Sequence, residues 1–438
     1  MQDHDLDALF GTLLAPFGRA VLAVSGGSDS VALMVLVSQW LASAKPPGLA
    51  VDVATVDHGL RAGSAREAAW VAERAKALGF QHATLVWGGV KPGSALQAKA
   101  REARYALLVA HARSVKPADG APTAVVTAHT ADDQAETLIM RLGRGSGLDG
   151  LAGMAPSRPL LPDASVQLVR PLLGLSKALL AATLTERGGT WLDDPSNERL
   201  DFERVRLRAA SDHLSALGLS NDKIALAAAR LTRSREALER VTDARLEALV
   251  QSHGGVYASL DRPAWEGEPE DIRVRLLARL LGAFGGQAKP AQLSQIEAVV
   301  AALARGRPTV QTLGGCIVSQ GHTKLRLYRE PAHHTLSELA LLPGEEVVWD
   351  WRFRVKYDAS EGDHAASEAV VVRPLGLAAY ATLRGGLALK DRPPARAAAG
   401  LPSLWSGGQL LAVPNLAGAK PSDDRFHAVF LGLKRESR

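Results

Sequence analysis

Cysteine is almost missing from this sequence, and long hydrophobic runs are missing altogether. Cys316 is the one cysteine among 438 residues, which excludes an internal disulfide framework and any Cys-x-x-Cys metal or redox site. No apolar stretch approaches the roughly 18 residues that a membrane-spanning helix requires, and no charged-then-apolar leader opens the sequence. These absences favour a soluble, cytoplasmic protein that does not have a membrane as its partner.

A strong excess of either charge is also missing. The sequence has 51 Lys and Arg residues against 46 Asp and Glu, which gives a net charge of +5. An excess of this size is compatible with a polyanionic partner such as nucleic acid, but many basic proteins bind none. With 47% hydrophobic residues the chain can bury substantial cores, and its length indicates two or three domains.

A glycine-rich turn is the most informative segment that is present. It follows an apolar run at 20–24, precedes a helical pattern, and reads Ser25-Gly26-Gly27-Ser28-Asp29-Ser30. Adjacent glycines let the backbone approach an anion, while the Ser hydroxyls, the first helical amides and the helix dipole all attract it. The pattern G-x-x-x-x-G-K-[ST] does not fit, which excludes the ordinary P-loop. We predict an ATP phosphate site here; the alternative is a plain turn between a strand and a helix.

Strand-like and helical patterns alternate through the first part of the chain. The strand-like segments are 20–24, 50–56, 83–87 and 124–128, and the helical segments are about 30–42, 65–78, 95–112 and 132–142. This alternation predicts an α/β fold in which helices cover a parallel sheet. Ligands of such sheets bind beyond the carboxyl ends of the strands, so we expect Ser25–Ser30, Asp57–Arg61 and His129–Glu136 to converge on one crevice.

The remainder of the chain has a different pattern. From about Asp212 to Arg305 it is helical, and beyond about residue 330 short extended pieces are rich in Gly, Pro and Trp, such as 346–357, 368–373 and 409–413. We therefore predict a catalytic domain over 1–210, a mainly helical domain over 211–330 and a small α/β or β-rich domain over 331–438.

Six separated motifs resemble those of the N-type ATP pyrophosphatases, or PP-loop superfamily, and within it the tRNA(Ile)-lysidine synthetases. They are SGGSDS (25–30), VDHGLR (56–61), AREARY (100–105), HTADDQAET (129–137), RGSGLDGL (144–151) and RPLL (170–173). The segment WLDDPSN (191–197) matches as well. The family then commonly has an Arg-Asn pair where this chain has Arg204-Val205, which puts the contacts of that asparagine in doubt.

The resemblance implies a tRNA-modifying ligase. ATP would adenylate C2 of the wobble cytidine, position 34, in the isoleucine tRNA with a CAU anticodon. Free L-lysine would then displace AMP to give lysidine, which changes codon recognition from AUG to AUA. ATP and Mg²⁺ are the expected cofactors, because Mg²⁺ neutralises charge on the departing phosphates. Asp29 is the expected Mg²⁺ ligand, and capping of the following helix is its alternative role.

Carboxylates follow the fourth strand-like segment, next to a histidine. On a helix Asp132 and Glu136 are four residues apart, and Asp133 and Glu136 are three apart, so these side chains share a face. The resemblance assigns Asp133 and Glu136 to the substrate lysine, whose ammonium group needs anionic partners. The alternative is an exposed acidic first turn, which helix N-termini favour in any case. His129 is expected either to contact the nucleotide or to be a buried histidine.

Further residues are assigned by the same resemblance. Arg101 and Arg104 lie on the predicted helix at 95–112, where one of them would contact AMP, the lysine carboxylate or tRNA phosphate. We expect the catalytic group to consist of Asp29, Arg104, Asp132, Asp133 and Glu136. Surface arginines of an amphipathic helix are the alternative. Asp57 and His58 would line the adenosine pocket. The two later domains would bind tRNA, and a second copy of the chain is a further partner to be tested.

Other functions compete with this interpretation. A tRNA thiolation enzyme uses the same ATP site, but its chemistry generally needs paired cysteines or an iron–sulfur cluster, which Cys316 alone cannot supply. An amidotransferase would need a glutaminase segment with its own nucleophilic cysteine. A nonenzymatic nucleotide-binding protein would have no need of the acidic cluster around Asp133.

Overall fold

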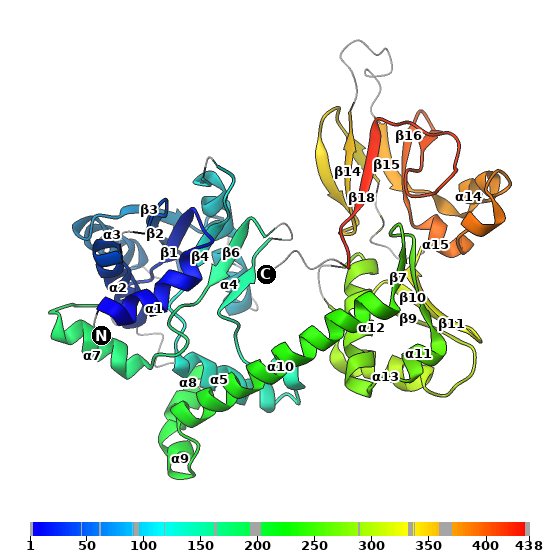
Figure 1. Ribbon diagram of the computed structural model, residues 1–438. Helices are drawn as coiled ribbons and strands as arrows, with labels where there is room; N and C mark the ends of the chain where they lie inside the picture. Colours follow the sequence, from blue (N-terminus) through cyan, green and yellow to red (C-terminus); the bar gives the residue numbers. More distant parts are fainter. Residues whose placement is uncertain are drawn as a thin grey trace. The chain divides into compact units, whose positions relative to one another are not determined.

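A computed structural model gives the fold of the chain. It describes residues 3–44, 46–60, 63–89, 91, 96–117, 119–161, 164–192, 203–287, 290–331, 336, 338–358 and 370–433. The chain forms two compact units, Met1–Glu236 and Ala237–Arg438, each with its own sheets and helices (Figure 1). Within the described ranges, no helix is both long enough and apolar enough to cross a membrane.

The first unit is built on a six-stranded sheet. Its strands lie in the order β3 (Gln81–Val86), β2 (Ala50–Asp57), β1 (Arg19–Ala23), β4 (Thr123–Val126), β6 (Val166–Val169) and β5 (Ser157–Pro159). All neighbours are parallel except β5 and β6. The α/β prediction and its four strands are confirmed, whereas β5 and β6 were not predicted. Because β1 lies between β2 and β4, the chain order reverses at β1, which is where open sheets of this type bind ligands.

Helices cover both faces of this sheet. The helices of this unit are α1 (Asp3–Leu14), α2 (Ser28–Ala44), α3 (Ser64–Ala77), α4 (Leu96–Ser114), α5 (Ala131–Leu142), α6 (Leu148–Leu151), α7 (Lys177–Glu186), α8 (Glu203–Ala209), α9 (Ser211–Ala216) and α10 (Asn221–Leu249), which continues into the second unit. One core includes side chains of α1, α2, α3 and α7, and a second includes Leu108 and Ala112 of α4. The predicted helices correspond to α2, α3, α4 and α5 and are confirmed.

The second unit begins with a sheet that the sequence did not reveal. Its order is β7 (Gln251–His253), β8 (Tyr257–Asp261), β11 (Lys324–Arg329), β10 (Cys316–Gln320) and β9 (Thr309–Leu313), all antiparallel. Helices α11 (Arg262–Glu266), α12 (Glu270–Phe284) and α13 (Leu293–Leu303) share a core with it. The expectation of helix throughout 212–305 was therefore wrong at β7 and β8, because strands of three and five residues give too short a pattern to read.

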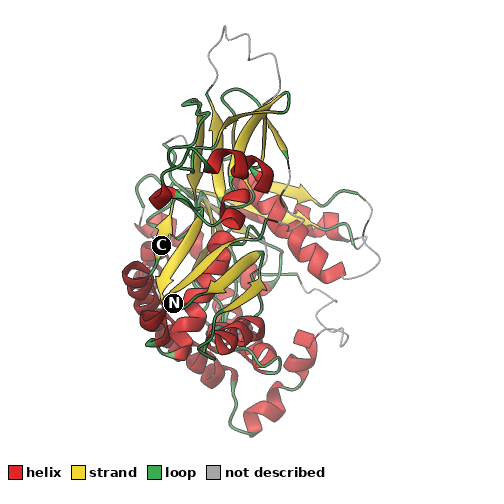
Figure 2. Cartoon of the chain, turned by 90° about the vertical axis from the view of Figure 1, so that its right-hand side faces the viewer, coloured by secondary structure: helices red, strands yellow, loops and turns green. Residues whose placement is uncertain are grey.

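Two smaller sheets complete the second unit. One has the order β12 (Leu339–Leu341), β15 (Val370–Pro374), β16 (Pro402–Ser406) and β17 (Gln409–Ala412); the other has β13 (Glu346–Trp349), β14 (Phe353–Tyr357) and β18 (Phe426–Phe430). Figure 2 shows these strands in yellow beside the short helices α14 (Gly376–Arg384) and α15 (Ala395–Ala399). The extended pieces predicted within 346–357 and 409–413 are confirmed, and that at 368–373 is confirmed from Val370 onward.

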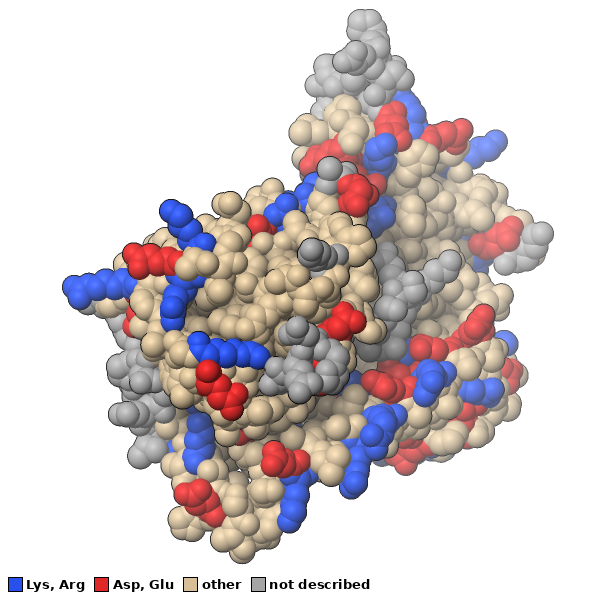
Figure 3. All heavy atoms as spheres, turned by 60° about the vertical axis from the view of Figure 1, so that its left-hand side comes forward, with Lys and Arg blue, Asp and Glu red and all other residues tan. Residues whose placement is uncertain are grey.

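Charged side chains of both signs are mixed on the surface. On the face of Figure 3, Lys and Arg are interspersed with Asp and Glu rather than gathered into a field of one sign. The small net charge of +5 is consistent with this mixture. Any attraction for a polyanion must therefore come from local arrangement.

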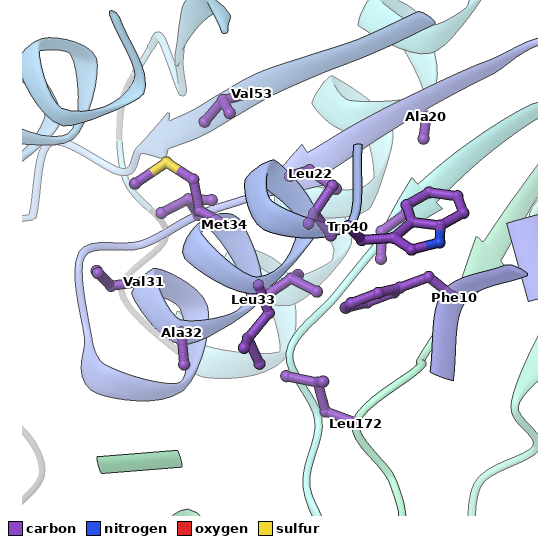
Figure 4. Close-up of a cluster of buried hydrophobic side chains, with 14 of the residues drawn as sticks. Phe10, Ala20, Leu22, Val31, Ala32, Leu33, Met34, Trp40, Val53 and Leu172 are labelled. Atoms are coloured by element: carbon purple, nitrogen blue, oxygen red, sulfur yellow. The ribbon is translucent and has the colours of Figure 1, made fainter. Parts of the chain in front are cut away.

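Helix α2 anchors the glycine-rich turn in the core. Its buried residues include Val31, Leu33 and Met34, which follow the turn directly (Figure 4). Trp40 packs against Phe10 of α1 with ring centroids 5.6 Å apart. Because burial of each large apolar side chain contributes about 1.5–3 kcal/mol, this helix is a rigid support for whatever its first turn binds.

Candidate active site

The three segments expected to form a crevice all lie at the same edge of the sheet. Strand β1 pairs in parallel with β2 on one side and with β4 on the other, so their carboxyl ends meet. Ser25–Ser30 follows β1, Asp57 and His58 end β2, and His129–Glu136 follows β4. The structure thereby places the predicted site residues of these segments on neighbouring strands.

The glycine-rich turn has the geometry of an anion cradle. Gly26 has a φ of +93°, and a Cβ on it would lie 2.9 Å from Leu192 Cδ1, so only glycine fits. At Gly27 a Cβ would meet only Ser25 Oγ, at 3.9 Å, which leaves this backbone open. Ser30 Oγ donates to the Gly27 carbonyl at 2.9 Å and accepts from the Ser25 amide at 3.2 Å. The turn is held in shape by its own serines, and the start of α2 faces it.

Asp29 occupies the first turn of α2 in an environment of mixed charge. Burial raises the pKa of its carboxyl above the ordinary value, and the negative charge of Asp133 raises it further. Lys177 opposes this rise, because its Nζ lies 3.9 Å from Asp29 Oδ2. A carboxylate in such a place has a strong preference for a cation.

The sequence Thr130-Ala131-Asp132-Asp133 starts α5 with a capping box. The Asp133 Oδ2 atom accepts hydrogen bonds from the amide and the hydroxyl of Thr130, both at 2.9 Å. Burial alone would raise the pKa of Asp133, but the Lys177 ammonium and the Thr130 amide lower it below its ordinary value. Asp133 is therefore an ionised carboxylate whose Oδ1 remains directed at cations.

Lys177 lies between Asp29 of α2 and the acids of α5. Its Nζ lies 3.3 Å from Asp133 Oδ1, while its backbone amide donates to Asp132 Oδ2 at 2.8 Å. The sequence analysis missed this residue. A signal was present, since a lysine at the first position of a helix, directly after the cap Ser176, opposes the helix dipole and implies nearby acids.

Asp132 is occupied by the protein itself. Its Oδ2 accepts from the Lys177 amide, and its Oδ1 accepts from Asn221 Nδ2 at 2.8 Å. These two bonds join the beginnings of α5, α7 and α10. Asp132 was expected in the catalytic group, and in this structure both of its carboxylate oxygens accept hydrogen bonds from the protein.

Glu136 is a buried carboxylate paired with arginines of α8. Arg208 Nε donates to Glu136 Oε1 at 2.6 Å, and Arg208 Nη2 lies 4.0 Å from Asp133 Oδ1. Arg204 Nε lies 3.8 Å from Glu136 Oε2. Burial favours the neutral form of Arg208, but the hydrogen bond that Arg208 donates to Glu136 and the negative charge of Glu136 raise the pKa of Arg208 above its ordinary value. Arg208 thus bridges the two acids, as expected for side chains on one face of α5.

The two histidines of the site are neutral at pH 7. Burial lowers the pKa of His129 to about 4, although the charge of Asp133 opposes this shift. One ring nitrogen of His129, Nδ1, lies 2.9 Å from Thr127 Oγ1. Burial and the neighbouring Arg104 likewise lower the pKa of His58 to about 4.

Arg104 lies against His58 rather than against the acids. The distance from Arg104 Nη2 to His58 Nε2 is 3.2 Å, and the His58 ring meets Trp87 edge-on at 5.9 Å. The pKa of Asp57 is lowered by hydrogen bonds from Ser64 and from the Gly59 amide. These residues form a second cluster, at the end of β2.

Other segments singled out by sequence are placed as follows. Arg101 lies with its Cζ 5.1 Å from the centre of the Tyr105 ring, and Arg144 pairs with Glu203. Arg141 donates to the carbonyls of Gly150 and Gly153 and thereby shapes the loop that contains Arg144. Arg61 and residues 193–197 lie outside the described residues.

The single cysteine is not available for chemistry. Cys316 lies in the core of the second unit, where burial raises the pKa of its thiol to about 12. A thiol of this kind stays protonated and unreactive. The site must therefore work without sulfur from the chain.

A parallel sheet whose first strand leads through a glycine-rich cradle into a buried helix defines the PP-loop class of nucleotide-binding proteins. In agreement, the family model described as a PP-loop domain matches residues 3–211. This class uses ATP, so the fold and the cradle together make the chain an ATP-utilising protein.

Similarity to whole proteins narrows the class. The tRNA(Ile)-lysidine synthase of Bradyrhizobium diazoefficiens is 44% identical over 335 residues, which cover 71% of this chain and 90% of that protein. That of Ruegeria pomeroyi is 40% identical over 92% of this chain and 90% of that protein, and that of Brucella canis is 34% identical over 93% and 89%. The chain belongs to the tRNA(Ile)-lysidine synthase family. It is thus an ATP-utilising ligase of tRNA modification, and the thiolase and nonenzymatic alternatives are not favoured.

Proposed function

We propose that the chain adenylates C2 of the wobble cytidine, position 34, in the CAU-anticodon tRNA(Ile) and then replaces AMP with L-lysine. The product, lysidine, would change codon recognition from AUG to AUA. The observation that carries this proposal is the position of the Lys177 ammonium, which lies 3.3 Å from Asp133 and 3.9 Å from Asp29. A lysine side chain already occupies the acidic groups beside the ATP cradle, which supports their use for a lysine substrate.

In the first half-reaction the turn at Ser25–Ser30 would hold the phosphates of ATP. The open backbone at Gly27 and the first amides of α2 can donate to phosphate oxygens. Arg104 and the neutral ring of His58 would contact the adenosine. The neutral ring of His129 would contact the nucleotide through Nε2, the nitrogen that does not face Thr127. The cradle would thereby align the α-phosphate with the cytidine oxygen while pyrophosphate leaves.

Asp29 is the residue proposed to hold Mg²⁺. The described residues contain no cluster of three or more acidic, His or Cys ligands, so a site made only of protein groups is not present among them. One carboxylate together with substrate phosphates is a usual arrangement for Mg²⁺, and the burial and negative surroundings of Asp29 suit it. When bound, Mg²⁺ would neutralise charge on the departing phosphates.

In the second half-reaction Asp133 and Glu136 would bind lysine. Free lysine carries two ammonium groups, and the one that attacks must first lose a proton from a group with a pKa of about 10.4. The acids would pair with the group that stays charged, in the positions now taken by Lys177 and Arg208. Asp132 would keep α5, α7 and α10 in register around them.

Incorporation of labelled lysine into RNA tests the proposed function directly. The full chain would be incubated with labelled lysine, ATP and a tRNA(Ile) transcript that has a CAU anticodon. Label should enter the RNA only when ATP is present, and a transcript with a GAU anticodon should stay unlabelled. Absence of label in the CAU transcript would reject the proposal.

Location and assembly are separate proposals. A cytoplasmic location fits an enzyme that acts on tRNA. A homodimer can be tested by light scattering of the full chain, where a mass near 46.3 kDa would show a monomer.

A further inference from the structure

Two neighbouring hollows lie on the second unit. The larger has a volume of about 400 Å³ and is lined by apolar side chains, among them Leu336, Leu375 and Leu377. The smaller, of about 80 Å³, is lined by Glu338, Val371 and the glycines Gly407 and Gly408. Arg373 and Trp405 line both. The larger volume is within the range of about 300–1,000 Å³ that small-molecule sites have.

Arg373 and Trp405 form a cation–π pair. They lie on the adjacent strands β15 and β16, and Arg373 Cζ is 3.9 Å from the centre of the indole ring. Trp405 Nε1 donates to Ser403 Oγ at 2.8 Å, and that hydroxyl donates to the Arg373 carbonyl at 2.8 Å. The hydrogen bond fixes the indole, and the half-buried guanidinium of Arg373 lies over its ring. A guanidinium plane is able to stack on a further planar group.

The walls beside this pair are apolar or bare backbone. A Cβ on Gly376 or Gly408 would meet nothing within 4 Å, so the backbone there borders open space. Leu377, which lines the larger hollow, is 53% exposed and so available for contact. Arg373 Nη1 lies 3.4 Å from Glu338 Oε1 at the rim, and this exposed pair is weak enough for a ligand to replace.

We propose that this hollow, with the Arg373–Trp405 pair as its base, binds an unpaired nucleotide of the tRNA. The proposal rests on the proposed function and extends it to a second site. Proteins recognise unpaired bases by stacking them on aromatic rings or on arginine planes, beside a positive charge for the phosphate. The hollow supplies each part: a guanidinium face, apolar walls for the base, and the Glu338 carboxylate as an acceptor for a ribose hydroxyl. An acidic peptide is a poorer fit, because its carboxylates would pair with the charge of Arg373 but would not stack on the guanidinium plane.

Binding of the full chain to a tRNA(Ile) transcript, measured by fluorescence anisotropy over a salt series, tests this site. Arg373→Gln should weaken binding at least about fivefold, which is the lower limit for loss of one stacked base. Arg373→Lys keeps the charge but not the plane, so it should weaken binding about threefold or more without changing the salt slope. Arg354→Gln is the matched control. Arg354 also makes an exposed ion pair at 3.4 Å, with Glu346, but it lines neither hollow.

A second pair of variants guards against a folding defect at Arg373. Leu377→Glu places a negative charge in the hollow at an exposed position and should weaken binding, whereas Leu389→Glu, at a leucine with 81% exposure elsewhere in the unit, should not. Lysine incorporation should be unchanged in the two controls, Arg354→Gln and Leu389→Glu, because neither residue lines the hollows. Normal affinity of Arg373→Gln and Leu377→Glu would overturn the site, as would full rescue by Arg373→Lys. Failure of wild-type protein to incorporate lysine would reject only the proposed function.

Discussion

Asp29 is the residue on which adenylation depends most directly in our proposal. Asp29→Asn keeps the size of this side chain in the first turn of α2 and an oxygen that can accept from Ser28 Oγ, but removes the charge that would hold Mg²⁺. Adenylate formation should fall by orders of magnitude while the fold stays intact. The measurement is tRNA-dependent release of pyrophosphate, with circular dichroism as the check on folding. Release near the wild-type rate would show that Asp29 only starts the helix.

Asp133 and Glu136 should affect lysine and not ATP. A hydrogen bond to a charged group contributes about 1.5–3 kcal/mol, so Asp133→Asn or Glu136→Gln should raise the KM for lysine at least about tenfold. The asparagine can still cap α5, which keeps the helix start. Adenylated tRNA should then accumulate or hydrolyse.

Measurement of lysine dependence and of the adenylated intermediate in the same samples gives the answer. A control is Asp149→Asn, since Asp149 is an acid of the neighbouring α6 and lies outside the acidic group. If the KM for lysine is unchanged in both test variants, Asp133 and Glu136 do not bind lysine. Their role is then structural: Asp133 caps α5 and Glu136 pairs with Arg208.

His129 should make stability depend on pH. Its pKa is near 4 in the folded chain and about 6.5 when unfolded, so below pH 6.5 the unfolded chain binds more protons and the free energy of unfolding falls. At pH 5 the loss should be on the order of 1 to 2 kcal/mol for this residue, from about 1.36 kcal/mol per pKa unit. Urea unfolding of the wild-type chain and of His129→Gln at pH 7, 6 and 5 should show a smaller loss in the variant. His213→Gln, at an exposed position, should behave as wild type. If the free energy of unfolding changes equally with pH in all three proteins, the lowered pKa of His129 is contradicted.

At the scale of elements, Asp132 should act as a connection between helices. Asp132→Ala removes the acceptor for the Lys177 amide and for Asn221 and leaves both donors without it. The free energy of unfolding should fall by about 1–3 kcal/mol, the cost of unpaired buried polar groups. Urea unfolding measures this. Loss of activity without loss of stability would instead give Asp132 a direct part in the chemistry.

The sequence could predict those elements whose signal is local. Strands β1, β2 and β4 are apolar runs bounded by turns, and the capping box at Thr130 and Asp133 lies within one turn of helix, so both can be read from neighbouring residues. The pairing of Lys177 with Asp133, or of Asn221 with Asp132, joins positions 44 and 89 residues apart, and no local pattern encodes it. Strand β7 has three residues, too few for alternation to show.

The residues of the candidate site could be predicted from the sequence, but the cations that pair with its acids could not. The spacing predicted that Asp133 and Glu136 share a helix face, and the family resemblance assigned them to the lysine ammonium group. That Arg208 and Lys177 neutralise these acids depends on where α7 and α8 pack, which is a tertiary property. For the same reason Asp132 could not be distinguished from its two neighbours in the acidic group.

At the scale of the whole molecule, the second unit is held together across its sheets. Asp350 is buried between Arg329 and Arg352, with Nε–Oδ2 distances of 2.9 and 2.6 Å, and Phe430 packs on Phe284 with centroids 4.9 Å apart. A chain cut near residue 330 would leave the buried Arg329 without Asp350, which costs several kcal/mol. The roles proposed for 211–330 and 331–438 in tRNA binding are therefore best tested in the full chain.

Salt dependence measures how much of the tRNA binding comes from phosphate contacts. Each neutralised phosphate releases counterions, so the logarithm of the tRNA affinity should fall linearly with the logarithm of the salt concentration. Contact with as few as four phosphates would weaken binding about a hundredfold between 50 and 200 mM salt. The affinity for ATP, whose phosphates would lie in one local cradle at Ser25–Ser30, should change far less, because only those few charges are involved. Anisotropy titrations of the full chain with labelled tRNA and with a fluorescent ATP analogue give the two slopes. If the salt slope for tRNA is as shallow as that for ATP, the chain recognises tRNA by its shape and its bases rather than by contacts with its phosphates.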